Sequence, residues 1–399
     1  MARLYLWRQL ASAGSNYSHD VATVGEIVEW TQRVYPTQLA EDWDAVGLVC
    51  GWPQTRVDRV LLCVDVTEPV VDQALADGAQ LILAHHPLLL RSVNSVAATD
   101  SRGRILHRLI AADCALLTAH TNADAANPGV SDALASAFGL IDLEPLVASP
   151  CGETDKLVVF VPREHATSLL DALAQCGAGT IGNYERCAYQ TDGLGTFRPV
   201  GEAAPTVGRV GQIETVRETR LEMVFPRHRR SDVVAALRAA HPYEEPAFDI
   251  VEMVPTPGAA GIGRVGNLVA EMSLAAFTEL VAGALPPTPQ GVRVAGDLAR
   301  PIHRVAVCGG SGGSLATAAA DSGAQAFVTA DFKHHSALDQ VLEGDVALVD
   351  VSHWASEYPW LWQAADQLTE AMRSRGDSVA VDVCTLRTDP WTAVLRSTG

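Results

Sequence analysis

The sequence predicts an α/β protein whose core is built from two similar halves, with a smaller α+β domain inserted between them. Two segments, beginning at Arg59 and Arg304, share Arg, Val, Cys and a later Gly-Ala-Gln at a constant offset of 245 residues without a gap. Each half alternates short apolar runs with helical stretches, as α/β layer proteins do. The segment between the halves has a different rhythm of strands and helices.

In each half, three short apolar runs rich in aliphatic residues have the character of buried parallel strands. A helical stretch lies between the first and second runs, so we expect a right-handed crossover. Gly and Ala are common in this chain, but the gapless spacing favours duplication over chance similarity. The runs cover 60–64, 81–84 and 115–119 in the first half, and 305–308, 326–329 and 346–351 in the second.

The segment between the halves is expected to be a ferredoxin-like α+β domain that folds on its own. Its apolar patterns predict the order β-α-β-β-β-α-β, in which ERCAYQT and GTFRP form separate strands. The predicted domains are an N-terminal extension at 1–20, a first core half at 21–150, the insertion at 155–254 and a second core half at 258–399.

Composition restricts the kinds of function. With 29 basic and 47 acidic residues, the chain has a net charge of −18, which disfavours duplex nucleic acid because such binding depends on Lys and Arg. A small phosphate compound in a metal-bearing cleft remains compatible with this charge. No apolar run approaches the roughly 20 residues of a membrane span. Eight cysteines without a Cys-x-x-Cys pair predict neither a zinc ribbon nor a disulfide framework, so we expect a reducing, cytoplasmic location.

Two adjacent histidines end the second apolar run of the first half. In LILAHHPLLL, His85 and His86 follow the run and Pro87 stops it, which places both at the carboxyl end of a parallel strand, where α/β sheets bind ligands. Because adjacent residues in an extended chain point in opposite directions, the two side chains are expected to serve two ions. A strand end with one hydrogen-bonded histidine explains this motif alone equally well.

His120 and Asp124 follow the third run of the first half, in LLTAHTNADAANPG. We expect Asp124 in the loop after the strand. Taken alone, this motif is also typical of ordinary turn chemistry.

His353 and Glu357 follow the third run of the second half, in VALVDVSHWASEYPW. Their i, i+4 spacing would place them on one face of a helix. However, Pro359 is favoured in the first turn of a helix, so we expect both residues in the loop before that helix.

Together these motifs predict a site for two divalent ions. All of them follow strand ends, and a pseudo-twofold arrangement of the halves would bring them to one crevice. Three imidazoles and two carboxylates suit zinc, iron or manganese, and a bridging carboxylate can hold two ions about 3.5 to 4 Å apart. The predicted metal ligands are His85, His86, Asp124, His353 and Glu357.

Two further motifs lie in the second half. CGGSGGSL at 308–315 could present backbone amides to a phosphate, although a tight turn between strand and helix is the interpretation we favour. TADFKHHSALD at 329–339 ends the strand that corresponds to the one before His85 and His86, so we expect this motif to reach the same cleft. Its polar residues there are Asp331, Lys333, His334 and His335. Lys333 could there meet an anionic substrate; a solvated turn lysine is the simpler interpretation.

As a set, the motifs resemble the family of type 2 homologues of GTP cyclohydrolase 1. The resemblance implies a three-layer αβα fold, a toroidal homohexamer and the same five ligands, with Glu357 bridging the ions. It also implies that His120 lies beside the metals and orients a ligand or water; the positions of Lys333 and His335 make them possible further residues near the metals. Ala45 departs from the family, which usually has Asn after Trp-Asp. The motifs are AEDWDAVGLVCGW at 40–52, LILAHHPLLL, HTNAD at 120–124, GIGRVGNL at 261–268, ADFKHHSA at 330–337 and the His-x-x-x-Glu of 353–357.

The insertion resembles the PII-like or CutA-like module of longer family members, with HPYEEPAFDI at 241–250 as its clearest mark. The resemblance implies that such a module trimerises and binds a small effector.

Three functions are compatible with these residues. The first is a hydrolase of a nucleotide or other phosphoester that uses a metal-activated water; no Gly-x-Ser-x-Gly elbow offers a competing nucleophile. The second is a non-catalytic, metal-binding regulatory hexamer. The third, GTP ring opening, is implied only by the family's name. That zinc chemistry favours a cysteine ligand, and none of the eight cysteines lies among the ligand motifs.

Overall fold

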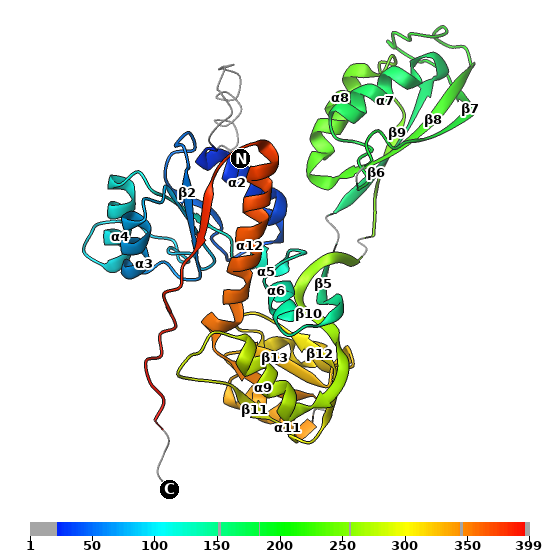
Figure 1. Cartoon of the computed structure of the whole chain (residues 1–399). Coiled ribbons are helices and arrows are strands. Elements are labelled where there is room, and N and C mark those ends of the chain that lie inside the picture. Colours follow the sequence, from blue (N-terminus) through cyan, green and yellow to red (C-terminus); the bar gives the residue numbers. More distant parts are fainter. Residues whose placement is uncertain (1–21, 151–152, 183, 255–256, 344–345, 396–399) are drawn as a thin grey trace. The chain divides into compact units, whose positions relative to one another are not determined.

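The chain forms two compact units in a computed structural model that describes residues 22–150, 153–182, 184–254, 257–343 and 346–395 (Figure 1). Unit 1 comprises Met1–Ser149 and Ala259–Gly399, and unit 2 comprises Pro150–Gly258. Unit 1 is therefore built from both ends of the chain, and unit 2 is inserted between them. The N-terminal extension predicted at 1–20 lies outside the described residues.

Unit 1 contains two sheets, which confirms the predicted mixed α/β class. The first has the strand order β1-β4-β3-β2-β15 and the second the order β11-β14-β13-β12-β10-β5. The strands of the first sheet are β1 (Gly47–Cys50), β2 (Arg59–Cys63), β3 (Leu81–Ala84), β4 (Ala115–Thr118) and β15 (Ala380–Val383). Those of the second are β5 (Ile141–Pro150), β10 (Pro257–Ser273), β11 (Arg293–Ala295), β12 (Pro301–Val307), β13 (Ala326–Ala330) and β14 (Ala347–Val351).

The two sheets repeat one pattern. In the first, β2, β3 and β4 are parallel neighbours and β1 pairs antiparallel with β4; β12, β13, β14 and β11 have the same relations in the second. Val60 pairs with Leu81, and Val305 with Ala326. The register is therefore the same at the offset of 245 residues.

The shared Gly-Ala-Gln has the same structural role in both halves. The side-chain oxygen of Gln80 accepts hydrogen bonds from the backbone amides of Asp58 and Arg59. Gln325 accepts the equivalent pair from His303 and Arg304. Each glutamine thus joins the start of the second strand to the start of the first.

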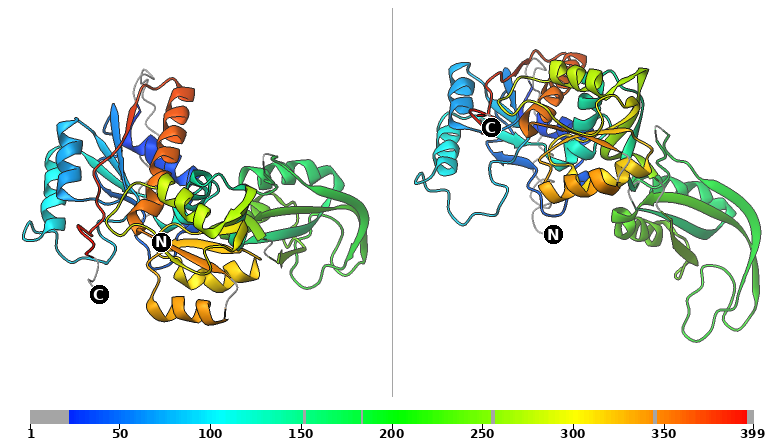
Figure 2. Two further views of the ribbon diagram at one scale, coloured as in Figure 1. Left: turned by 60° about the horizontal axis from the view of Figure 1, so that its bottom comes forward. Right: turned by 90° about the horizontal axis from the view of Figure 1, so that it is seen from below.

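Helices cover both faces of each sheet (Figure 2). Successive strand side chains point to opposite faces, and the apolar ones on each face are buried against these helices. The outer face of the first sheet packs on α3 and α4, and that of the second on α10 and α11. The inner faces of both sheets share one core with α2, α6, α9 and α12. The helices are α2 (Val24–Val34), α3 (Glu68–Ala76), α4 (Ser101–Ala111), α5 (Thr121–Ala125), α6 (Val130–Ala137), α9 (Leu274–Ala284), α10 (Ala316–Asp321), α11 (His334–Glu343) and α12 (His353–Arg375).

Helix α12 is the longest and belongs to the central core. Its N-cap is Ser352, whose side chain accepts from the amide of Ala355, and its C-cap is Gly376 in the left-handed conformation. Its buried positions include Trp360, Leu361, Ala364, Leu368 and Met372, which form one apolar stripe. The stripe anchors the helix whose first turns carry His353 and Glu357.

Unit 2 has the order β-α-β-β-α-β, so the prediction of one more strand is wrong. ERCAYQT and GTFRP contribute to one strand, β7, which pairs with β8 along its whole length. The four-stranded sheet has the order β7-β8-β6-β9, and one face packs on both helices of the unit. The elements are β6 (Thr154–Pro162), α7 (Ala166–Gln175), β7 (Tyr189–Phe197), β8 (Glu214–Pro226), α8 (Arg230–Ala240) and β9 (Phe248–Glu252).

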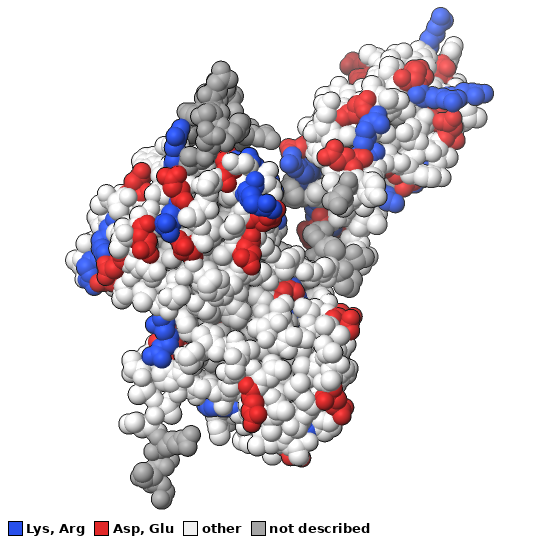
Figure 3. Space-filling view, in the orientation of Figure 1, with Lys and Arg blue, Asp and Glu red and all other residues white. Residues whose placement is uncertain are grey.

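Among the described residues, no helix combines the length and the apolar character needed to cross a membrane. On the face drawn in Figure 3, Lys and Arg side chains lie among Asp and Glu side chains instead of forming one broad basic area.

Candidate metal centre

His85 and His86 follow β3 directly. Their backbone amides donate to the carbonyls of Cys63 and Val64 next to them, but the chain bends at both histidines. The expectation that the side chains point in opposite directions is wrong, because this bend replaces the extended geometry on which it rested. The two rings lie 5.0 Å apart, centroid to centroid, and both approach Glu357.

His120 and Asp124 come from the segment after β4. His120 is the N-cap of the short helix α5, and Asp124 lies within that helix, so its predicted place in a loop is wrong. Asn122 stabilises this turn: its side-chain oxygen accepts from the amide of His120, and its side-chain nitrogen donates to the carbonyl of Tyr35. The amide of His120 and the carbonyl of Tyr35 thus have side-chain partners in place of the backbone partners that a neighbouring strand would provide.

His353 and Glu357 lie in the first turns of α12, not in a loop before it. The cap by Ser352 starts the helix at His353, and Pro359 lies inside the helix. Proline at that position costs one backbone hydrogen bond, which the packing of α12 in the central core outweighs. The i, i+4 spacing therefore does put both side chains on one helical face.

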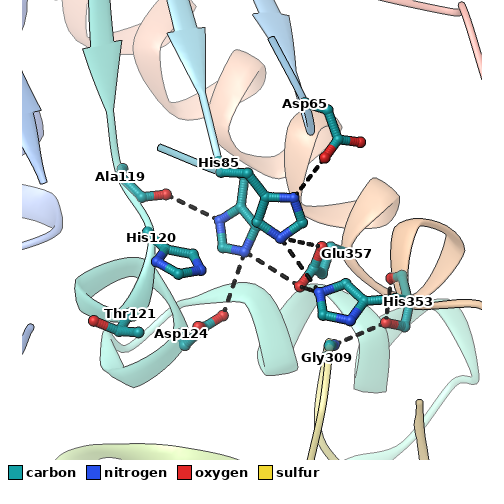
Figure 4. A network of polar contacts seen from close by, with 12 residues as sticks. Asp65, His85, Ala119, His120, Thr121, Asp124, Gly309, His353 and Glu357 are labelled. Atoms are coloured by element: carbon teal, nitrogen blue, oxygen red, sulfur yellow. Dashed lines mark hydrogen bonds and ion pairs between the residues drawn. The ribbon is translucent and has the colours of Figure 1, made fainter. Parts of the chain in front are cut away.

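Three of the predicted ligands, all histidines, surround the carboxylate of Glu357, and Asp124 lies beside one of them, His85 (Figure 4). Its Oε1 lies 3.0 Å from Nε2 of His353 and 3.4 Å from Nε2 of His85. Its Oε2 lies 3.1 Å from Nε2 of His86. On the far side of His85, Oδ1 of Asp124 lies 3.7 Å from the same Nε2. Each oxygen of Glu357 thus faces a different histidine of the first half.

Two groups of side chains have the spacing of metal ligands. His85, His86 and His120 form one group, and His86, His353 and Glu357 form the other, with the ligand atoms of each group within 4.8 Å of one another. His120 was expected only to orient a ligand or water, but this geometry also allows it to bind an ion itself.

The four histidines are held by their Nδ1 atoms, so that Nε2 is directed inward. His86 contacts Asp65 at 2.7 Å, His120 contacts Asp44 at 2.8 Å and His353 contacts Asp331 at 2.6 Å. The fourth, His85, contacts the carbonyl oxygen of Ala119 at 2.9 Å. An acceptor at Nδ1 places the ring proton there and leaves the Nε2 lone pair for an ion.

The charges in the site favour cations. Glu357 is almost fully buried, and burial alone would raise its pKa, but the facing imidazoles hold that pKa well below its usual value. The carboxylate of Glu357, with that of Asp331, raises the pKa of His353 to about 11. Burial lowers the pKa of His86, yet Glu357 and Asp65 outweigh it and raise the pKa to about 10.

Three buried polar atoms of the cluster have no hydrogen-bond partner among the described residues. They are Nε2 of His85, Oδ1 of Asp124 and Oε2 of Glu357. An unpaired polar atom in the interior costs on the order of 1 to 3 kcal/mol, so such atoms call for a partner. An imidazole nitrogen and a carboxylate oxygen are donors that zinc, iron and manganese accept. The residues present therefore fit metal ions.

The CGGSGGSL segment packs directly against the site. Gly310 has a φ of +65°, and a Cβ there would lie 2.5 Å from Oε1 of Glu357. Its amide donates to Ser356, while those of Gly309 and Gly312 donate to Ser131 and Thr329. These amides are already bonded, which supports the tight-turn interpretation over phosphate binding.

Lys333 and His335 are not part of the cluster. Both are exposed, and neither makes a polar contact with the five ligands in the described part of the chain. Sequence reasoning missed Asp44 and Asp65, and it placed Asp331 at the cleft without predicting its contact with His353. Asp65 lies just beyond the end of β2, so the strand-end rule that found the histidines could have found it.

Comparisons with known proteins agree with the fold. A model of the family described as Duf34/NIF3 (NGG1p interacting factor 3) matches residues 22–390. A Mycobacterium leprae protein named GTP cyclohydrolase 1 type 2 homolog is 48% identical over 373 residues, 93% of this chain and 95% of the relative. A Bacillus subtilis protein of the same name is 37% identical over 332 residues, 83% of this chain and 88% of the relative.

Two solved structures match the fold over nearly the whole chain. A Bacillus cereus protein related to NIF3 has a TM-score of 0.77 at 36% identity, covering 94% of this chain and 100% of that one. The Staphylococcus aureus protein SA1388 has a TM-score of 0.80 at 28% identity, covering 94% and 99%. The resemblance found in the motifs is confirmed, and the chain belongs to the Duf34/NIF3 family.

Proposed function

We propose that this protein binds two divalent metal ions and uses them to hydrolyse a nucleotide or another phosphoester. The observation that supports this most is the convergence of three imidazoles on both oxygens of the buried Glu357, with Asp124 beside them. When bound, two such ions lower the pKa of a water and offset negative charge on a phosphoryl group.

The chain's own residues would position these ions. His85, His86, Asp124, His353 and Glu357 are the proposed ligands, and Glu357 is the proposed bridge. Asp65 and Asp331 hold His86 and His353 at Nδ1, which fixes the tautomer that can bind an ion. Zinc, iron and manganese all suit this set of nitrogen and oxygen donors.

We further propose that the core arose by duplication of one half, since the sheets share strand order and register. A closed homohexamer in the cytoplasm completes the proposal. Sedimentation tests the assembly, and only monomer at micromolar concentration would contradict it.

A regulatory role without turnover is the second candidate. Unit 2 contains a cavity of about 600 Å³, lined by aromatic residues such as Phe160 and Tyr243 together with charged ones such as Glu218 and Arg220. A cavity of this size can hold a small molecule. GTP ring opening, suggested by the names of the relatives, has weaker support, because Cys308, a buried thiol near Asp124 and Glu357, has its pKa raised to about 12 by burial and these carboxylates.

A substrate screen on protein with defined metal content tests the proposal. Phosphoesters and nucleotides, including GTP, would be tested with wild-type protein, Asp124→Ala and Glu357→Ala. Glu370→Ala is the matched control, because Glu370 lies on the same helix with an exposed side chain. We expect metal-dependent phosphate release that both site variants lose and the control keeps. Turnover by metal-free protein would contradict the mechanism, and no turnover of any substrate would favour the regulatory role.

A further inference from the structure

The chain beyond β15 returns to the metal centre. Residues 385–395, here named the C-terminal strap, contain no helix or strand and continue from the red strand in Figure 1. Two consecutive residues of the strap, Thr388 and Asp389, make side-chain hydrogen bonds to residues near the metal centre, Asp65 and Ser352. Asp389 is buried, although most of the strap around it is exposed.

Thr388 reaches the first half of the site through Asp65. Its hydroxyl donates to Oδ2 of Asp65, while Oδ1 of the same carboxylate contacts Nδ1 of His86. Both oxygens of Asp65 are thereby engaged, one by the strap and one by a proposed ligand. The hydrogen bond from Thr388 restricts the orientation of the Asp65 carboxylate. The contact of Asp65 with Nδ1 in turn restricts the orientation of the His86 imidazole.

Asp389 reaches the second half through Ser352. The Ser352 hydroxyl donates to Oδ2 of Asp389, and Oδ1 of Asp389 accepts from the amide of Trp391 at 2.9 Å. Ser352 is the N-cap of α12, and the next residue is His353. The strap therefore holds the start of the helix that carries His353 and Glu357.

The two contacts meet at one group of ligands. His86 and His353 belong to the same group of metal-spaced side chains as Glu357, and their Nε2 atoms lie 3.3 Å apart. Within the described residues, neither Thr388 nor Asp389 makes a hydrogen bond or ion pair with His85 or Asp124. The strap thus contacts the supports of two proposed ligands, His86 and His353, which follow strands of different sheets. It makes no such contact to His85 or Asp124 within the described residues.

We propose that the C-terminal strap positions one of the two ion sites, the one formed by His86, His353 and Glu357, and slows the loss of its ion. Thr388 and Asp389 are its positioning residues. This inference rests on the proposed metal centre but not on hydrolysis, so it holds for a catalytic or a regulatory protein.

Ion release from zinc-loaded, full-length protein tests this inference. Zinc loss to an excess of a chromogenic chelator would be followed for wild type, Thr388→Val, Asp389→Asn and Thr388→Ser. Thr392→Val is the matched control, because Thr392 is an exposed strap residue and the same substitution there breaks no contact to the site.

We expect two phases of release in the wild type. Thr388→Val should accelerate one phase by about 10- to 100-fold, as for other residues that orient a ligand, and leave the second phase unchanged. Thr388→Ser should restore the wild-type rate because it keeps the hydroxyl. Asp389→Asn should affect the same phase as Thr388→Val, since both act on the same ion.

A second measurement separates positioning from general stability. Cobalt-loaded Thr388→Val should show a changed visible absorption spectrum, while its metal-free form should unfold at the same temperature as the Thr392→Val control. Equal acceleration of both phases, or wild-type release by Thr388→Val, would overturn the strap proposal while leaving the metal centre intact. Wild-type protein that binds no zinc would overturn both.

Discussion

The two halves of unit 1 have sheets of the same register but present their proposed metal ligands differently. The first half places His85 and His86 at the end of β3 and Asp124 in the short helix after β4. The second half places His353 and Glu357 on α12. In the second half, the position equivalent to His86 is Asp331, 245 residues later. Asp331 does not face Glu357 as a ligand; its carboxylate contacts Nδ1 of His353.

This difference shows how one repeated scaffold can build a single site. If both halves had kept the same residues, two equal half-sites would face each other. Instead, the strand end supplies a ligand in one half and the partner of a ligand in the other, while the helix of the second half brings a carboxylate between them. The halves are therefore unequal contributors, and variants of each should have different effects on the two ions.

The largest effect is expected from Glu357→Ala, which removes the group shared by both halves. Wild-type protein should hold about two ions per chain, and Glu357→Ala should hold almost none, because its oxygens face histidines of both halves. Elemental analysis after reconstitution measures this, with Glu370→Ala as the control. A Glu357→Ala protein that keeps one full ion would show that the carboxylate serves only one site.

A smaller loss is expected from His353→Ala. Its Nε2 lies near His86 and Glu357 and, among the described residues, makes no hydrogen bond or ion pair with His85 or Asp124. One ion should therefore be lost and the other kept. His85→Ala should give the reverse pattern. Distinguishing them requires site-resolved data, for example cobalt spectra of the two singly loaded proteins. Identical spectra would contradict the assignment of unequal halves.

The third effect concerns the histidine partners. Asp331→Asn keeps the shape but removes the charge that holds Nδ1 of His353, and ion affinity should fall about 10- to 100-fold. Asp65→Asn should act to a similar degree through His86. Asp339→Asn, an exposed position on α11, serves as the control in the same competition titration with a chelator. An unchanged affinity in both aspartate variants would mean that these carboxylates do not tune the site.

Ion binding should also depend on pH. Without an ion, the pKa values of His86 and His353 are about 10 and 11, so both bind protons at neutral pH, and an ion must displace them. Apparent affinity should rise with pH by up to about tenfold per unit for each proton released. Calorimetry in buffers of different ionisation enthalpy counts these protons, and a count of zero at pH 7 would contradict this electrostatic account.

The raised pKa values of His86 and His353 also determine whether metal-free protein becomes more or less stable as pH rises. Because the folded-state pKa values of both histidines are raised, their contribution to stability is fully present below about pH 6.5, the unfolded value. It is lost as pH rises through 10 and 11. Denaturant unfolding of metal-free protein at pH 7 and pH 10 tests this, and greater stability at pH 10 would have the wrong sign.

The sequence was sufficient to predict the ligands' places in the chain but not their geometry. Strand ends were visible because buried parallel strands are short and aliphatic, which located His85, His86 and the segment of Asp124. Pro359 misled the prediction for His353 and Glu357, since the core packing that keeps proline inside α12 is a long-range effect. The contact of Asp44 with His120 also joins residues far apart in sequence, and no local pattern encodes it.

The smallest effect is expected from removing the inserted segment. All five proposed ligands lie in unit 1, and unit 2 has its own core, so deleting residues 155–254 should leave the ion content at the wild-type value. Elemental analysis of the purified deletion protein tests this. A folded deletion protein without metal would show that the insertion helps to build the centre.

The central claim is that both halves hold one dinuclear centre around Glu357. Anomalous diffraction at the zinc edge, from crystals of zinc-loaded protein, tests it most directly. We predict two peaks about 3.5 to 4 Å apart, both next to the carboxylate of Glu357, with His86 and His353 on one ion and His85 and Asp124 on the other. A single peak, or two peaks that lie away from Glu357, would contradict the claim.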